Sequence, residues 1–117
     1  MSLVALSWVA HLSLDDVDGT PRAVLTILAD RSNDPGYAAF PAVATIASTL
    51  GCSTRTVQRA FAKLEAAGLI RRGDQHAVRN FRGGRRPTVW DVLTPALTAR
   101  EARAAAYPGI HFNHRNT

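Results

Sequence analysis

The sequence predicts a mainly α-helical fold with a small antiparallel pair of β-strands, and three observations support this prediction. Three segments, residues 5–12, 43–50 and 57–64, carry apolar residues at the i, i+3, i+4, i+7 spacing of one helix face. Two short β-capable runs, residues 69–72 and 88–93, follow the third segment. The length of 117 residues suits one domain. We therefore expect a single domain over residues 1–117.

The first twelve residues, MSLVALSWVAHL, predict a helix docked on the core. Ala5, Trp8, Val9 and Leu12 follow the helical spacing. The segment lacks the cationic start and the cleavage site of a signal peptide, and the acids of DDVD follow it. No stretch approaches the roughly 18 apolar residues of a membrane span, so we expect no membrane segment.

The first core helix is expected to begin after DDVDG, with Thr20 as N-cap and Pro21 as the first helical residue. Its buried face would carry Val24, Leu25 and Leu28, and it would end before the turn NDPG. A second helix is expected through AVATIASTL. Its apolar positions are Val43, Ile46, Ala47 and Leu50.

The third helix is expected to follow almost at once. Gly51 closes the second helix, because glycine readily takes the left-handed conformation at a helix C-terminus. Ser53 is a good N-cap, since its hydroxyl can accept the amide of Thr56. A helix over residues 54–66 follows, and Gly68 ends it. Its apolar stripe is Val57, Ala60, Phe61 and Leu64.

The rest of the chain predicts a β-pair and a last helix. The runs LIRR and TVWDVL would pair in antiparallel fashion around the long connection GDQHAVRNFRGGRRP. PALTAREARAAA, after Thr94, predicts the last helix.

The positive charge is concentrated in the middle of the chain. The total formal charge is +5, but residues 1–50 carry −3, residues 51–90 carry +7 and residues 91–117 carry +1. A clustered cationic face favours a polyanionic partner, because phosphate binding releases counterions. The alternative is a solvated basic face without a partner.

The spacing of the second and third helices indicates which polyanion is the partner. Two short helices joined by a glycine-containing turn, here LGCS, form a helix-turn-helix, whose second helix enters the DNA major groove. Arginine and glutamine can bond base edges bidentately, and Ser or Thr can hold phosphate. The alternative, an amphipathic helix with a merely soluble outer face, does not explain the short turn or the absence of acids before Glu65. We therefore predict double-stranded DNA as partner, contacted by Ser53, Thr54, Arg55, Thr56, Gln58, Arg59 and Lys63.

The stretch VLTILADRSNDPGYAAFPAVATIASTLGCSTRTVQRAFAKLEAAGLIRR, with TVWDV after it, resembles winged helix-turn-helix domains of bacteriophage, plasmid and actinobacterial proteins. STRTVQRAFAKLEAAGLI is the specific part. The resemblance implies a three-helix core plus a two-stranded wing over residues 20–93. The helical segments predicted at 1–19 and 94–117 flank this core. The resemblance also implies control of transcription or opening of replication origins. Ala42 departs from the family, which usually has serine there; this weakens the second helix's cap by roughly 1 kcal/mol.

The connection at residues 73–87, the wing loop, supplies a second candidate DNA contact. RGGRRP (82–87) is strongly basic, and arginine in such an arm suits the minor groove. The alternative is a solvated loop. We predict contacts to backbone or minor groove from Arg82, Arg85 and Arg86, with Arg85 and Arg86 ahead of Arg82 and Arg79.

Metal, cofactor and catalytic sites are not expected. His111 and His114 are spaced like a ligand pair, but Cys52 is the only cysteine and no second cluster completes a zinc site. No P-loop or G-x-S-x-G motif is present, so we expect neither a cofactor nor an enzyme. The single cysteine indicates a reducing cytoplasm, and a DNA partner would place the protein with the nucleoid.

A homodimer is a further expectation, because symmetric DNA readers pair two recognition helices. The alternative is that both terminal segments fold back on the monomer. Candidate dimer contacts are Trp8, Leu97, Ala104 and Tyr107.

A small transcriptional regulator is the first role expected. The alternatives are a replication or recombination accessory of a phage or plasmid, and a protein-interaction module.

Overall fold

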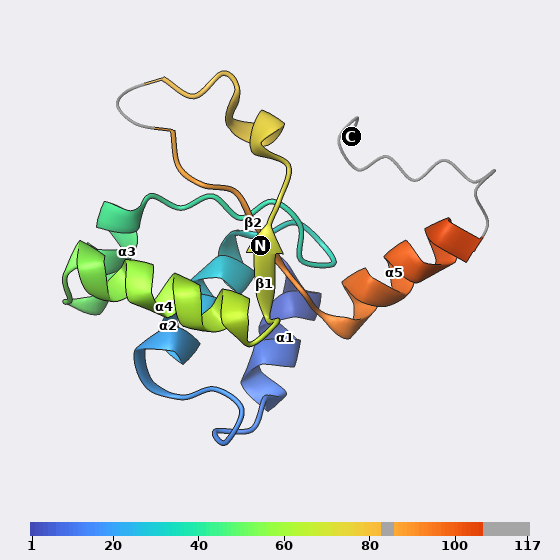
Figure 1. Cartoon of the computed structure of the whole chain (residues 1–117), viewed down its shortest axis with the longest axis horizontal. Helices are drawn as coiled ribbons and strands as arrows, with labels where there is room; N and C mark the ends of the chain where they lie inside the picture. The colour runs from blue at the N-terminus through green and yellow to red at the C-terminus, as the bar shows by residue number, and fades with distance from the viewer. Residues whose placement is uncertain (83–85, 107–117) are drawn as a thin grey trace.

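The computed structural model describes residues 1–82 and 86–106, and within them it confirms a mainly α-helical fold with one antiparallel strand pair. Figure 1 shows the helices gathered around the strand pair, with the wing loop rising from it. The elements are α1 (Leu3–His11), α2 (Gly19–Arg31), α3 (Val43–Leu50), α4 (Thr54–Ala66), β1 (Ile70–Arg72), the 3₁₀-helix η1 (Gln75–Val78), β2 (Trp90–Val92) and α5 (Pro95–Ala106).

Helix α2 lies at the centre of the core and packs against both α1 and α4. The predicted buried faces are confirmed at α2 and α4; in α3, Ile46 and Ala47 are buried, while Val43 and Leu50 are half-buried against the core. The apolar stripes of three short helices thus meet in one cluster, which stabilises helices too short to be stable alone. The fully or nearly fully buried positions of α2 and α4 are Val24, Leu25, Leu28, Ala29, Val57, Ala60, Phe61 and Leu64.

The N-terminal helix docks as predicted, but the start of α2 was predicted wrongly. Ser2 caps α1 by accepting the Ala5 amide at 3.0 Å. Helix α2 begins at Gly19, not after Thr20, because Asp18 is the N-cap and accepts the Gly19 amide at 2.7 Å. Asp is at least as good a cap as Thr, and its charge also favours the positive end of the helix dipole.

The sheet has a third contributor that the sequence did not indicate. Strand β1 pairs with β2 in antiparallel register, Ile70 opposite Val92 and Arg72 opposite Trp90. The segment 36–39 then adds to the free edge of β2: Ala39 and Trp90 exchange amide-to-carbonyl bonds of 2.8 and 2.7 Å, and Val92 donates to the Gly36 carbonyl at 2.7 Å. A Cβ on Gly36 would lie only 2.5 Å from the carbonyl oxygen of Val92, so the close approach of the two backbones requires glycine.

Helix α5 follows the sheet and extends away from the body (Figure 1). Thr94 starts it: its hydroxyl accepts the Leu97 amide at 3.1 Å and donates to the Pro35 carbonyl at 2.8 Å. The prediction that Leu97 contacts a second copy is wrong, since the chain's own atoms bury this side chain completely. Trp8 is half-buried against the core, and Ala104 is half-exposed. Tyr107, His111 and His114 lie outside the described residues.

None of the helices in the described ranges is both long enough and apolar enough to cross a membrane.

Candidate nucleic-acid interface

A three-residue turn joins α3 to α4 and confirms the predicted turn geometry. Gly51 has φ 68°, in the left-handed region. The Cys52 amide then bonds back to the Ala47 carbonyl at 3.0 Å. Ser53 accepts the Thr56 amide at 3.1 Å and so caps α4 as predicted, whereas Ala42 makes no side-chain bond at the start of α3. The turn therefore fixes the direction in which α4 leaves α3.

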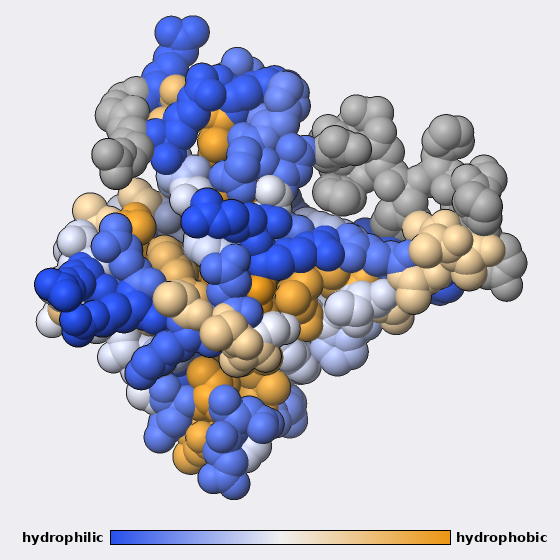
Figure 2. All heavy atoms as spheres, in the orientation of Figure 1, coloured by the Kyte–Doolittle hydropathy of each residue, from blue (hydrophilic) through white to orange (hydrophobic). Residues whose placement is uncertain are grey.

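The centre of the exposed side of α4 is cationic. At roughly 100° per residue, Arg55, Arg59 and Ala62 lie opposite the buried stripe, and all three are exposed. The guanidinium groups of Arg55 and Arg59 make no hydrogen bond or ion pair with any described residue. Ala62 was not predicted as part of the face; its small side chain lets a ligand approach the helix closely. Figure 2 shows hydrophilic side chains gathered over the N-terminal end of α4 and over the wing loop, on the same face.

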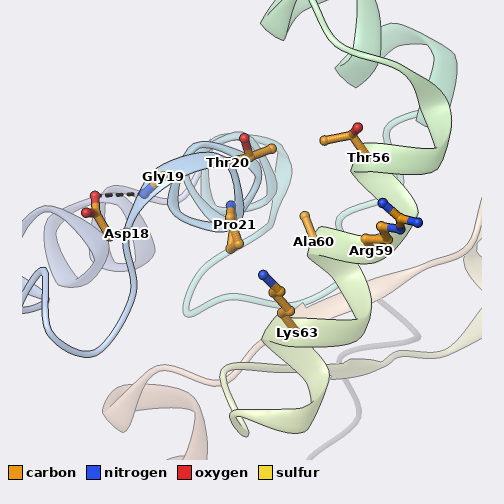
Figure 3. Close-up of a pocket in the computed structure, with 8 residues that line it drawn as sticks. All are labelled: Asp18, Gly19, Thr20, Pro21, Thr56, Arg59, Ala60 and Lys63. Carbon is orange, nitrogen blue, oxygen red and sulfur yellow. Dashed lines mark hydrogen bonds between the residues drawn. The ribbon is translucent and has the colours of Figure 1, made fainter.

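Thr54 and Gln58 lie on the flank of α4 next to Phe61, and both are exposed. The opposite flank faces α2 across a groove of about 420 Å³, which Thr56, Arg59 and Lys63 line on the α4 side. In Figure 3, Lys63 points toward the start of α2, while Arg59 points away from it.

Two hydroxyls of the predicted site are engaged within the helix cap. The oxygens of Ser53 and Thr56 lie 2.9 Å apart, and Thr56 is half-buried. Asp18 places a carboxylate at the α2 side of the groove. The guanidinium groups of Arg55 and Arg59, which are exposed and take no part in these bonds, are accessible to an anionic ligand.

Gln75 closes the base of the wing loop, a contribution that the sequence did not indicate. Its side-chain amide donates to the carbonyls of Gly73 and Val89, at 2.9 and 3.0 Å, and accepts the Val89 amide at 3.0 Å. The Gly73 amide also donates to the Val89 carbonyl at 2.9 Å. The side chain thus prolongs the strand pairing beyond β1 and β2.

Above this base the wing loop is basic. Arg79, Arg82 and Arg86 are exposed, and Arg86 donates to the Arg79 carbonyl at 2.8 Å. Phe81, with 40% of its surface exposed, lies between Arg79 and Arg82 in the sequence. The predicted contact Arg85 lies outside the described residues.

An ionic network ties the strand pair to α5 and to the turn at residue 37. Arg71 donates to buried Asp91 at 3.1 Å and to both carboxylate oxygens of Glu101 at 2.8 and 2.6 Å. Asp91 also accepts the amide of Ala38, which has a left-handed φ of 60°. The hydrogen bond with Glu101 is the main reason that the pKa of Arg71 is raised. Arg71 is therefore a structural residue, although its charge is part of the +7 carried by residues 51–90.

Tyr37 makes the network sensitive to alkaline pH. The pKa of Tyr37 is raised to about 12. Burial is the main cause, and the hydrogen bond from the Tyr37 hydroxyl to Glu101 is the next. The unfolded chain should lose this proton near pH 10. The stabilisation is thus fully present below pH 10 and is lost as the pH rises toward 12, by at most about 1.4 kcal/mol per pH unit. We expect urea unfolding across this range to show that slope, and a flatter one for Tyr37→Phe. Equal slopes for the two proteins would contradict the assignment.

No group of three or more His, Cys, Asp or Glu side chains comes together as a metal site within residues 1–82 and 86–106.

Comparison with known protein families finds a match that covers the turn and both of its helices. Residues 19–70, from the start of α2 to the first residue of β1, match a family described as a helix-turn-helix domain. Comparison with curated proteins finds no match.

Proposed function

We propose, on the premise that residues 19–70 belong to the helix-turn-helix domain family, that the protein binds double-stranded DNA with sequence preference and acts as a small transcriptional regulator. The observation that carries this proposal is the exposed N-terminal half of α4, where Arg55 and Arg59 are free of partners among the described residues. In such domains this helix enters the major groove, which an α-helix fits.

Each predicted contact has a role that suits its chemistry. Arg55, Gln58 and Arg59 read base edges, since arginine and glutamine bond guanine and adenine bidentately. Thr54, together with Ser53 and Thr56, holds phosphate beside the free amides at the start of α4, since the hydroxyl pair of Ser53 and Thr56 uses only one of its two protons internally. Lys63, directed toward the groove between α4 and α2, contacts the DNA backbone. The wing arginines Arg82, Arg85 and Arg86 contact backbone or minor groove.

The protein acts by binding alone, without catalysis or a cofactor, in the cytoplasm with the nucleoid. A homodimer would place two copies of α4 on two half-sites. A role in replication or recombination of a phage or plasmid would use the same interface, with sites in repeated arrays rather than near promoters.

Selection from a pool of randomised duplexes tests the proposal directly. We expect enrichment of one motif, recovered at a salt concentration near 150 mM. Two inverted half-sites, about one helical turn apart between centres, would support the homodimer. Recovery of no motif above the starting pool would contradict sequence preference and favour a protein-interaction module instead.

Removing charge from the wing loop should weaken binding to all sequences. For Arg85→Ala with Arg86→Ala we expect the slope of log K against log salt to become shallower by about 2, since each phosphate contact contributes about 0.9. The control, Arg31→Ala with Arg103→Ala, removes two exposed arginines outside α4 and the wing loop. A wing variant with the slope of the unaltered protein would show that Arg85 and Arg86 do not touch phosphate.

A further inference from the structure

Arg71 and Arg72 are neighbours on β1, but their side chains lie on opposite faces of the sheet, as alternation along a strand requires. Arg71 directs its guanidinium group to Asp91 and Glu101 and uses three N–H donors there. Arg72 is exposed and makes no hydrogen bond or ion pair with any described residue. Of these two adjacent arginines, only Arg72 thus leaves its guanidinium N–H groups available to a ligand.

The Arg72 side chain is nevertheless held in place. Its guanidinium carbon lies 5.5 Å from the centroid of the Trp90 ring, within the range of a cation–π interaction. Trp90 is its direct cross-strand partner. Because this contact uses no hydrogen-bond acceptor and Arg72 has no other described partner, its guanidinium N–H groups remain available for an acceptor.

The contact with Trp90 places Arg72 beside α4. The rings of Trp90 and Phe61 lie 5.0 Å apart, tilted by 32°, and Phe61 belongs to the buried stripe of α4. The flank of α4 next to Phe61 carries Gln58, one of the predicted base contacts. Arg72 therefore lies between the flank of α4 and the base of the wing loop. Glu65, the acid of α4, forms no ion pair with it in the described structure.

We propose that Arg72 binds a phosphodiester group of the DNA backbone, at the edge of the groove that α4 enters. The inference rests on the proposed function and adds to it a residue that the sequence did not single out. Phosphate is the expected ligand, because the guanidinium fork matches its oxygens bidentately. The stack on Trp90 holds the side chain before binding, which reduces the conformational entropy lost when a ligand arrives.

Arg72→Gln, compared with Arg71→Gln, tests the proposal, since each variant removes one charge from adjacent positions of β1. Binding is measured to a selected duplex and to a scrambled duplex between 50 and 300 mM salt. For Arg72→Gln we expect roughly tenfold weaker binding to both duplexes, and a salt slope shallower by about 0.9. Arg71→Gln should lower the unfolding temperature but keep the salt slope. Arg72→Lys should restore the slope, because the charge is retained.

The outcomes separate this inference from the proposed function. Normal DNA binding with the salt slope of the unaltered protein in Arg72→Gln would overturn the inference alone. The same loss of slope in Arg71→Gln and Arg72→Gln, both folded, would also overturn it, since charge rather than position would then decide. Absence of duplex binding by the unaltered protein would overturn the proposed function and this inference with it.

Discussion

Arg55→Ala with Arg59→Ala is expected to lose sequence-specific DNA binding while keeping its fold. A bidentate base contact discriminates by roughly 1–3 kcal/mol. Removing two should lower the ratio of affinities for selected and scrambled duplexes by at least about 30-fold. The fold should survive, because both side chains are exposed on α4 and alanine has the highest helix propensity. The measurement is the dissociation constant for each duplex at one salt concentration, with far-UV circular dichroism as the test of folding.

The matched control for this variant is again Arg31→Ala with Arg103→Ala, which removes the same charge from α2 and α5. It should weaken binding slightly and equally for both duplexes, through the net charge alone. If Arg55→Ala with Arg59→Ala kept the specificity ratio of the unaltered protein, α4 would not read bases. The protein-interaction role would then become the better explanation of its exposed face.

The helices and the turn were predictable because their signals are local. Val57, Ala60, Phe61 and Leu64 repeat at the helical period and are all buried. Ser53 caps α4 through a bond that spans only three residues. At the start of α2 two acceptable caps, Asp18 and Thr20, lie two residues apart, and each has a local signal: the charge of Asp18 suits the helix dipole, and Pro21 suits the position after a cap at Thr20. The structure chooses Asp18.

What could not be predicted depends on contacts between distant parts of the chain. Segment 36–39 joins β2 across about fifty residues, and its sequence has no alternation that marks a strand. The bonds of Arg71 to Asp91 and Glu101 span 20 and 30 residues. Alternation along β1 indicates that Arg71 and Arg72 lie on opposite faces. Only the positions of Glu101 and Trp90 decide which of the two is left exposed.

Trp90→Ala is expected to be the most destabilising of the substitutions considered. The Trp90 side chain is 4% exposed and packs on Phe61, so it joins the sheet to α4. Replacing a buried large aromatic side chain with alanine costs roughly 3–5 kcal/mol, a large part of the 5–15 kcal/mol typical of a whole domain. Urea unfolding followed by far-UV circular dichroism measures the loss, since the substitution itself alters tryptophan fluorescence.

Trp8→Ala is the matched control, because Trp8 is the other tryptophan of the chain and is only half-buried on α1. It should lose less free energy of unfolding than Trp90→Ala, and Trp90→Phe should fall between them, because it keeps a ring against Phe61. The order follows from position: α1 covers one side of α2, whereas Trp90 lies where β2, segment 36–39 and α4 meet. A larger loss for Trp8→Ala would mean that the docked terminal helix, rather than the junction of sheet and α4, holds the domain together.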